Sequence, residues 1–271
     1  MGTAVGDGTE RNYGGIVAYD GTAYAGFQSQ PNRPTIQGQL NKALARLTQE
    51  PVKVIGAGRT DAGVHATGQV ISFRSGWRHP LADLERGLNA LLPRDIAVWA
   101  MRCVDDGFHA RYSARERTYL YSIYTDDRRR PLLDRYAAHV PEPLDVGAME
   151  VAAECVIGRH DLAALGQSPS GRSTVREVSD ARWMPLEMGI GGDQAGIGFR
   201  VSANGFLRGM VRRLVGSLLE VGRGRWSAAQ FADLIASQDI GQAAAPAPAC
   251  GLCLQHVTYD DEIPQWRMPE G

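Results

Sequence analysis

Lysine is nearly absent from this chain, because only Lys42 and Lys53 stand among its 29 basic residues and the others are arginines. With 30 acidic residues the formal net charge is −1, so the total charge gives no reason to expect a polyanionic partner. The charges are unevenly distributed along the chain, however, since the segment from Arg200 to Arg225 contains six arginines but only one acidic residue, Glu220. Charge is therefore segregated along the chain, and the planar guanidinium is the side chain best shaped to bind phosphate.

Cysteine is also scarce. The four cysteines, at positions 103, 155, 250 and 253, are too few and too scattered for a disulfide scaffold of this size, so we expect reduced thiols. Cys250 and Cys253 form a CxxC pair, but zinc needs two further ligands at matching spacing. A redox CxxC opens a helix, whereas the residues after Cys253 alternate like a strand. We therefore expect no metal site.

Long apolar runs are missing, since none approaches the roughly 18 residues that a membrane helix needs. The first residues have neither the basic nor the apolar segment of a secretion signal, and Gly6 breaks the myristoylation pattern. We expect no membrane contact and a cytoplasmic location. A hydrophobic content of 44% with 22% charged residues excludes fibrous and wholly disordered chains.

Hydrophobic periodicity predicts a first α/β half over residues 13–107, after a disordered N-terminal tail at 1–12. A helix capped by Thr35 is expected to end near Pro51, and a second helix, with leucines at helical spacing, is expected to end at Pro93. The expected strands are 14–20, 52–57, 69–73 and 96–104.

A second α/β half is predicted over residues 108–259, before a flexible tail at 260–271. The expected strands are 117–124, 174–184, 196–203 and 257–259, and the expected helices are 144–157 and 205–221. Strands that alternate with helices, with one hairpin around residues 189–196, favour an α/β or α+β sheet with helices on one face.

The densest group of special residues is the segment GAGRTDAGVHATGQV, residues 56–70. Its four glycines permit positive φ angles and a close approach of a ligand to the backbone. Dinucleotide-binding and P-loop motifs are excluded, because the first needs glycine where Asp61 stands and the second needs a lysine. Arg59 within about 4–6 Å would keep the Asp61 carboxylate ionised, which suits a nucleophile or a base. Alternatively, the two residues only clamp a tight turn.

Six further stretches resemble blocks of one protein family and follow that family's order. They are YDGTAYAGFQSQP (19–31), TIQGQLNKAL (35–44), LNALLPRDIAV (88–98), FHARYSARERTYLYSIY (108–124), NGFLRGMVRRLVGSLLEVG (204–222) and APAPACGLCL (245–254). Together with GRTDAGVHATGQV they span nearly the whole chain from Tyr13 to Tyr259. On these blocks the sequence resembles the tRNA pseudouridine synthase A family.

The resemblance implies an α+β pseudouridine synthase fold. Two ferredoxin-like α/β halves would form a mixed, mostly antiparallel sheet with helices on one face and a central RNA-binding cleft. It also implies isomerisation of uridine to pseudouridine at positions 38–40 in the anticodon stem-loop of tRNA, by a homodimer without a cofactor. The chemistry needs no redox cofactor, because the uracil leaves C1′ through N1 and rejoins it through C5, so no electron enters or leaves.

Carried over residue by residue, the resemblance makes Asp61 the catalytic aspartate, acting as nucleophile or base, with Arg59 beside it. Tyr119 matches the active-site tyrosine that lies against the uracil, and Arg212 matches the arginine that pairs with the catalytic carboxylate. Besides Tyr119 and Arg59, the resemblance implies substrate contacts by Gly58, His65, Asn89, Arg111, Arg208 and Leu252.

From the residues alone, several side chains have a second interpretation. Tyr119 and Tyr121 share one face of a strand and could both be core residues. His65 and His109 match hydrogen-bonded structural histidines better than ligands. A flipped base needs an aromatic or apolar surface to receive it, and the family match favours Tyr119 for that position.

The arginines have two interpretations as well. Arg208 and Arg212, four apart on the expected helix, could bind a phosphate or a buried carboxylate, or could be solvated. The stretches RERTYLY (115–121) and DDRRRP (126–131) add arginines that could follow a phosphate backbone.

Two departures from the family pattern are visible. Arg208 and Gly209 stand where members commonly carry a histidine, and DLAALG (161–166) lacks the usual phenylalanines. Two other functions stay open: a non-catalytic tRNA-binding or chaperone protein of the same fold, and a hydrolase that cleaves N-glycosidic bonds and releases uracil.

Overall fold

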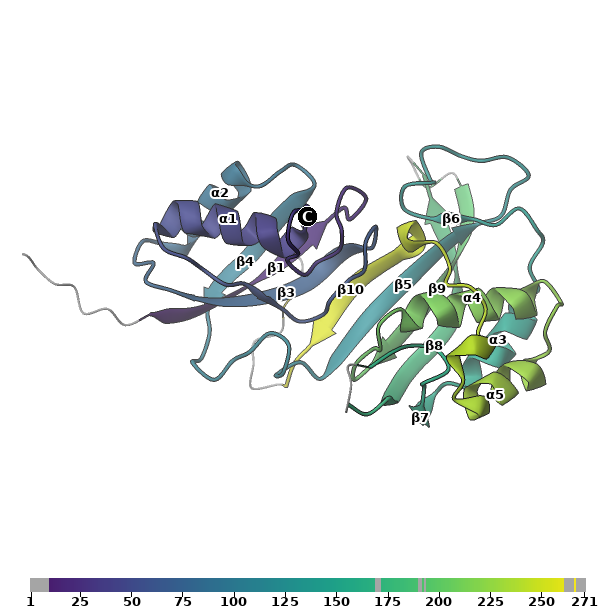
Figure 1. Cartoon of the computed structure of the whole chain (residues 1–271). Coiled ribbons are helices and arrows are strands. Elements are labelled where there is room, and N and C mark those ends of the chain that lie inside the picture. The colour runs from purple at the N-terminus through teal and green to yellow at the C-terminus, as the bar shows by residue number, and fades with distance from the viewer. Residues whose placement is uncertain (1–9, 169–171, 190–191, 193, 261–265, 267–271) are drawn as a thin grey trace, which may run out of the picture.

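One mixed sheet runs through both halves of the chain (Figure 1). The computed structural model describes residues 10–168, 172–189, 192, 194–260 and 266. The strands are β1 (Arg11–Tyr19), β2 (Ile55–Gly56), β3 (His65–Ser75), β4 (Ile96–Cys103), β5 (Glu116–Tyr124), β6 (Ala138–His139), β7 (Gly158–Asp161), β8 (Val175–Met188), β9 (Gln194–Ala203) and β10 (Leu252–Thr258). The helices are α1 (Ile36–Thr48), α2 (Leu81–Leu91), α3 (Val146–Glu154), α4 (Met210–Gly222) and α5 (Ala228–Ser237).

The strand order is β4-β1-β3-β10-β5-β9-β8-β7, with β2 on β3 and β6 on β5. Within the described ranges, only the pairs β10 with β3 and β6 with β5 are parallel. The sheet is therefore mixed and mostly antiparallel, and the predicted α+β class is confirmed. The last strand, β10, inserts between β3 of the first half and β5 of the second, so the chain's own end joins the two halves.

Figure 1 shows α1 and α2 over the β4-β1-β3 part of the sheet, and α3, α4 and α5 over the part that contains β9 and β8. The side chain of Thr35 caps α1 by accepting the Gly38 N–H at 3.2 Å, as predicted. Ile36, Leu40 and Leu44 are fully buried. Their spacing of four places them on one helix face, and burying that face against the sheet stabilises the helix more than its intrinsic propensity does.

The predicted helix at 205–221 starts later than expected, at Met210. Gly209 adopts a left-handed φ of 72° at the N-cap, so the chain before it cannot continue the helical path. Arg208 instead exchanges backbone hydrogen bonds with Gln167, at 3.0 and 3.3 Å. The prediction that Arg208 and Arg212 share one helix was wrong.

Three elements were not predicted: β6, β7 and α5. The first two are strands of two and four residues, too short for a hydrophobic alternation to be visible. A signal for α5 was present, because Ser227 and Gln230 form a capping box ahead of the buried Phe231 and Leu234. β10 is also longer than the expected strand at 257–259.

Both predicted tails are partly ordered. β1 begins at Arg11, so residues 11 and 12 belong to the sheet. Trp266 is only 2% exposed, and the guanidinium carbon of Arg102 lies 3.5 Å from the centroid of its ring. A flexible tail was the wrong prediction for Trp266, because burial of a large indole outweighs the entropy of ordering the chain that carries it. Residues 1–9, 261–265 and 267–271 lie outside the described part.

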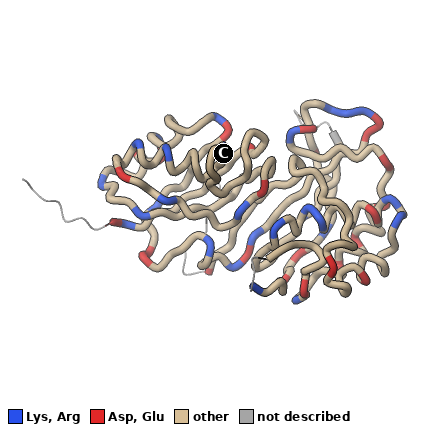
Figure 2. The backbone as a smooth tube through the Cα atoms, in the orientation of Figure 1, with Lys and Arg blue, Asp and Glu red and all other residues tan. Residues whose placement is uncertain are grey.

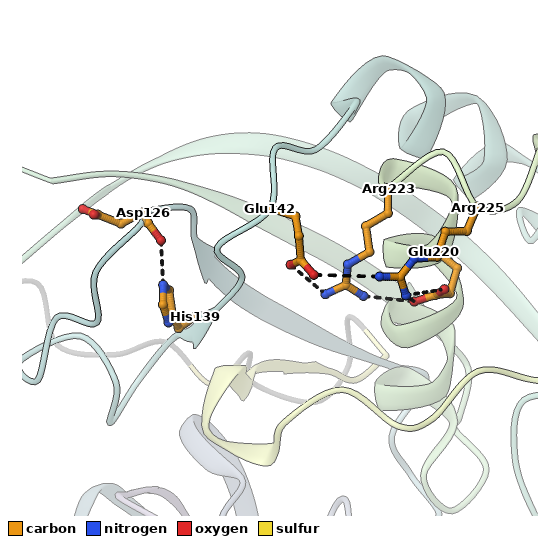
Figure 3. Close-up of polar contacts among 6 residues, drawn as sticks. All are labelled: Asp126, His139, Glu142, Glu220, Arg223 and Arg225. Atoms are coloured by element: carbon orange, nitrogen blue, oxygen red, sulfur yellow. Dashed lines mark hydrogen bonds and ion pairs between the residues drawn. The ribbon is translucent and has the colours of Figure 1, made fainter.

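The arginine-rich stretch from Arg200 to Arg225 is less available than its sequence indicated. Arg223 lies 3.0 Å from Glu220 and 3.3 Å from Glu142, and Arg225 lies 3.1 Å from Glu220 (Figure 3). Arg200 lies 3.3 Å from Asp180 on the neighbouring strand. Glu220 within the stretch, together with Glu142 and Asp180 from other segments, therefore neutralises half of the six arginines.

Two acidic residues, Asp126 and Asp127, directly precede three arginines in the loop at 126–130, so both signs of charge lie close together there (Figure 2). Arg130 pairs with Asp126 at 2.5 Å, and Arg128 lies 3.9 Å from Asp127. Such exposed pairs contribute little to stability. These pairs reduce the positive potential of the loop at 126–130, so its arginines are less suited to bind phosphate.

Among the described residues, no helix is long and apolar enough to cross a membrane. The same residues hold no group of three or more His, Cys, Asp or Glu side chains that could bind a metal ion. All four cysteines are free, as predicted. Burial raises the pKa of Cys253, on β10, to about 11, so the reactive thiolate is disfavoured.

A polar cluster around Asp20 also links the halves. Asp20 follows β1 and accepts hydrogen bonds from Arg135 Nε at 2.5 Å and Tyr136 Oη at 3.1 Å, both in the second half. Burial alone would raise the pKa of Asp20, but hydrogen bonds from Thr22 and Arg135 and the nearby His65 outweigh it and lower the pKa to about 2. The charged carboxylate therefore stabilises the folded state.

Asp20→Asn is expected to destabilise the protein by about 1–2 kcal/mol at neutral pH, because it weakens bonds made to a charged acceptor. Since the folded-state pKa is depressed, the stabilisation is present above about pH 4 and is lost as the pH falls towards 2. Urea unfolding of both proteins between pH 7 and pH 2.5 checks this. The exposed Asp106, 3.4 Å from Arg74, gives the control Asp106→Asn, and a stability difference that stays constant with pH would contradict the prediction.

Candidate active site

Buried polar side chains hold the loop between β2 and β3 in place. The side-chain amide of Gln69 makes two hydrogen bonds to the backbone of Gly58. Its oxygen accepts the Gly58 N–H at 3.0 Å, and its nitrogen donates to the Gly58 carbonyl at 2.7 Å. The hydroxyls of Thr60 and Tyr19 are hydrogen-bonded at 2.8 Å. Because both partners are in the interior, the loop backbone has a defined position.

A second loop, between β1 and α1, packs directly against the first. Gly26 has a φ of +98°, and a Cβ there would lie 2.7 Å from the Thr60 carbonyl oxygen and 3.2 Å from the Asp61 carbonyl carbon. A Cβ on Gly21 would lie 2.0 Å from the Val64 carbonyl oxygen. Only glycine permits this approach. The block at 19–31 therefore supports the loop that carries Asp61.

Asp61 is half-buried and stands in a turn closed by the Val64 N–H, which donates to the Asp61 carbonyl at 3.2 Å. Among the described residues, no hydrogen bond or ion pair engages its carboxylate. The turn is clamped by Thr60, Gln69 and the neighbouring loop, so the carboxylate is not needed for that purpose. It is available to a ligand.

Tyr119 lies at the centre of the sheet, on β5, and is 6% exposed. Its hydroxyl lies 3.5 Å from the position that a Cβ on Gly58 would occupy. Burial raises the pKa of Tyr119, the Arg117 charge opposes this, and the Asp61 charge raises it further. The phenol therefore stays protonated within electrostatic reach of the Asp61 carboxylate.

The two tyrosines of RTYLY differ in what their hydroxyls bind. Tyr121 donates to the Pro248 carbonyl at 2.8 Å and is a core residue. The Tyr119 hydroxyl has no hydrogen-bond partner among the described residues. The two rings share a face, as predicted, but only Tyr119 has a free polar group.

Sequence reasoning missed two residues beside the Tyr119 ring. Phe206 meets it edge to face, with centroids 5.0 Å apart. Leu254 is its direct neighbour on β10, and Leu254 Cδ2 lies 3.6 Å from the Cβ position at Gly58. The predicted Leu252 instead pairs with Tyr121 and is 5% exposed. A shift of two residues along a strand keeps the same face, so only the strand register distinguishes Leu254 from Leu252.

A group of arginines lies next to the loop. Arg59 is exposed, and its pKa is lowered first by partial burial and then by the charges of Arg111 and Arg172, against an opposing effect of Tyr112. None of these three arginines has an acidic partner within 4.0 Å among the described residues. Unpaired cations this close together repel one another, so an anion between them would be stabilised.

Arg212, on α4, does not pair with Asp61 in this structure. Its Nε donates to the Ala247 carbonyl at 2.7 Å, and no ion pair joins it to a carboxylate within the described ranges. The segment it binds does reach the loop, because a Cβ on Gly63 would lie 3.2 Å from the Ala249 Cβ. Arg212 thus lies near the site without completing the predicted pair.

Two further predicted contacts, His65 and Asn89, use polar atoms in hydrogen bonds to the backbone, although the buried Nε2 of His65 has no hydrogen-bond partner among the described residues. His65 is 5% exposed, and its Nδ1 accepts the Gly21 N–H at 3.1 Å, which matches the structural interpretation. Asn89 donates to the Val98 carbonyl and accepts the Val98 N–H, each at 2.8 Å. This amide fastens α2 to β4, and the geometry does not support a substrate contact.

Together, the fold and the site define the class: an α+β protein in which a loop carboxylate and a phenol on a central strand of the mixed sheet have no hydrogen-bond partner, and nearby arginines have no acidic partner, among the described residues. Such a set is suited to an enzyme that acts on a nucleotide within RNA.

Comparisons with known proteins place the chain within that class. The model of the tRNA pseudouridine synthase family matches residues 16–113 and 152–260. A tRNA pseudouridine synthase A of Roseiflexus castenholzii is 46% identical over 93% of this chain and 92% of its own length. A tRNA pseudouridine synthase A of Chloroflexus aurantiacus is 42% identical over 94% of this chain and 91% of its own length. One of Burkholderia thailandensis is 42% identical over 91% of this chain and 89% of its own length. The chain belongs to the tRNA pseudouridine synthase family.

Proposed function

We propose that this chain isomerises uridine to pseudouridine in tRNA, at positions 38–40 of the anticodon stem-loop. The observation that carries the proposal is the Asp61 carboxylate, which acts electrostatically on the Tyr119 hydroxyl; neither group has a hydrogen-bond partner in the part of the chain that the structure describes. Both groups lie in a chain that is 46% identical to a tRNA pseudouridine synthase A. Polar groups without an internal partner, on a strand and on a loop that buried side chains hold in place, are those that a substrate can bind.

The reaction requires little of the protein beyond one carboxylate. The bond from C1′ to N1 breaks, the uracil turns, and C5 bonds to C1′; the proton leaves C5 and N1 regains one. Asp61 either bonds covalently to the substrate during this exchange or removes a proton from the sugar to give a glycal. Both routes conserve atoms and electrons, so the reaction itself calls for no cofactor.

The remaining residues are suited to bind a flipped nucleotide. Leaving the stack costs a few kcal/mol, and the ring of Tyr119 with its neighbours Phe206 and Leu254 offers an apolar surface to the uracil. Arg59 and Arg111 could bind the adjoining phosphates, because no acidic side chain of the described residues neutralises either of them. We place the central RNA-binding cleft here, along the loop at 57–64.

The direct test is incubation of the purified protein with unmodified tRNA, followed by mass-shift labelling of pseudouridine in the anticodon arm. Pseudouridine at any of positions 38–40 supports the proposal. Release of free uracil would identify a hydrolase. Binding of tRNA without any product would identify a non-catalytic tRNA-binding protein.

Tyr119→Phe is expected to fold normally and to slow pseudouridine formation about 10²-fold, because it removes one polar contact with the substrate and no hydrogen bond among the described residues. Tyr121→Phe is the matched control. It loses the bond to Pro248, so it should cost about 1 kcal/mol of stability and leave the rate unchanged. Thermal unfolding and single-turnover kinetics of both variants separate the two effects. Equal rates for Tyr119→Phe and the wild type would show that Tyr119 is only a core residue.

A homodimer and a cytoplasmic location complete the proposal, and the first of these rests on the family resemblance. Light scattering at micromolar concentration tests the first, with a mass of twice 29.4 kDa as the expected result. A monomer under all salt conditions would contradict it.

A further inference from the structure

Arg117, two residues before Tyr119 on β5, is a buried cation with no acidic partner in the part of the chain that the structure describes. It is 8% exposed, so it does not face RNA as its place in RERTYLY suggested. Its hydrogen bonds go to backbone carbonyls: Nε and Nη2 to Ala57 at 3.3 and 3.1 Å, Nη1 to Ala114 at 3.0 Å and to Asn204 at 2.9 Å, and Nη2 to Arg111 at 2.5 Å. A guanidinium has five N–H groups, and every one is used.

The four carbonyls belong to three separate segments, and each segment carries part of the candidate site. Ala57 directly precedes the loop with Gly58 and Asp61. Arg111 and Ala114 belong to the turn that places the Arg111 side chain beside Arg59. Asn204 directly follows the last residue of β9 and lies two residues before Phe206, which packs on Tyr119. The Arg117 side chain therefore connects the three segments, two residues before Tyr119 on the same strand.

This arrangement is a costly way to achieve stability alone. Burial of an ion without a counter-ion is penalised, and the pKa of Arg117 is lowered mainly by burial. Apolar packing of the same volume generally stabilises a core at least as well. A fully satisfied polar network does something that apolar packing does not, because its directional bonds specify one arrangement of the groups that it joins.

We propose that Arg117 is a positioning residue: its guanidinium, bound to the carbonyls of Ala57, Arg111, Ala114 and Asn204, sets the placement of the Asp61 loop, Arg111 and Phe206 around Tyr119. Lysine cannot replace it, since an ammonium has three N–H groups and no planar fork. The inference rests on the proposed function, because its effect is measured as pseudouridine formation.

The test compares Arg117→Lys, which keeps the charge, and Arg117→Met, which keeps the approximate length, with the wild type. Arg86→Lys is the matched control, because Arg86 is 77% exposed on α2 and pairs only with Asp83. For each protein, thermal unfolding sets a temperature at which it is fully folded. Single-turnover rate constants at saturating tRNA and the dissociation constant for tRNA are then measured at that temperature.

We expect the rate constant of folded Arg117→Lys to fall about 10²-fold, as a displacement of about 1 Å in a catalytic group does, with the dissociation constant within about threefold of the wild type. Hydrogen exchange of the peptide covering 57–64 should quicken while that of β8 does not. An unchanged rate in folded Arg117→Lys would overturn the inference, as would a loss of rate explained wholly by unfolding. If Arg117→Met does not fold, Arg117→Lys decides the outcome. An inactive wild type would contradict the proposed function instead, so the two failures are distinguishable.

Discussion

Asp61→Asn is expected to slow pseudouridine formation by about 10³-fold or more, because amide nitrogen and oxygen neither attack carbon nor accept a proton as a carboxylate does. The affinity for tRNA should stay within about threefold, since the arginines that would bind phosphate are untouched. The fold should not suffer either. No internal hydrogen bond or ion pair of the Asp61 carboxylate is present among the described residues, so its replacement leaves no partner unsatisfied.

The measurement is a single-turnover assay with labelled tRNA, together with filter binding and thermal unfolding of the same preparations. Asp83→Asn is the control, because Asp83 lies on α2 in an exposed pair with Arg86 and should change none of the three. Turnover near the wild-type rate would show that Asp61 only closes a turn. Joint loss of turnover and tRNA binding would contradict a purely chemical role.

The second large effect concerns the joint between the halves. A Cβ on Gly68, in β3, would lie 1.9 Å from the Gln255 carbonyl oxygen and 2.7 Å from its carbonyl carbon. These are backbone atoms of β10, so they cannot rotate away as a side chain could. Gly68→Ala is therefore expected to push β3 and β10 apart and to destabilise the protein by about 3 kcal/mol or more. For a chain of this size that is a fall in Tm of roughly 6–12 °C.

Differential scanning calorimetry checks the prediction, with Gly107→Ala as the control. A Cβ on Gly107 meets nothing within 4 Å, so that variant should match the wild type closely. Activity of Gly68→Ala should fall as well, even where it is folded, because β10 carries Leu254 beside Tyr119. A Tm equal to that of the control would mean that the two strands tolerate a larger separation.

Much of the local structure could be predicted because its causes are local. Thr35 marks the start of α1 by a bond to an N–H three residues away, and apolar residues at a spacing of four mark the buried face of that helix. The boundary of α4 was missed for a local reason too. Gly209 takes a left-handed φ, and a glycine in a helical pattern permits that conformation without requiring it.

For the site too, some residues could be named from local sequence, and others are neighbours only because of the fold. Asp61 and Tyr119 lie within stretches that resemble family blocks, so both could be named from the sequence. The sequence could not show that Leu254 rather than Leu252 neighbours Tyr119, because both face the same side of β10 and only the pairing with β5 decides this. The bonds of Asn89 to the backbone of Val98 could not be predicted, because Val98 becomes its neighbour only when α2 packs on β4.

The sequence by itself determined the family, the glycine-rich loop with its carboxylate, and most of the strands and helices, since residue type and short-range spacing express these directly. Only the tertiary structure decided which charges are free. Arg117 is hydrogen-bonded to carbonyls, and Arg223 is neutralised by Glu142 from a distant segment, whereas Arg59 and Arg111 have no acidic partner among the residues that the structure describes. The physical reason is that a charge is compensated by whatever folding brings within a few ångströms of it, and the order of residues along the chain does not record that distance.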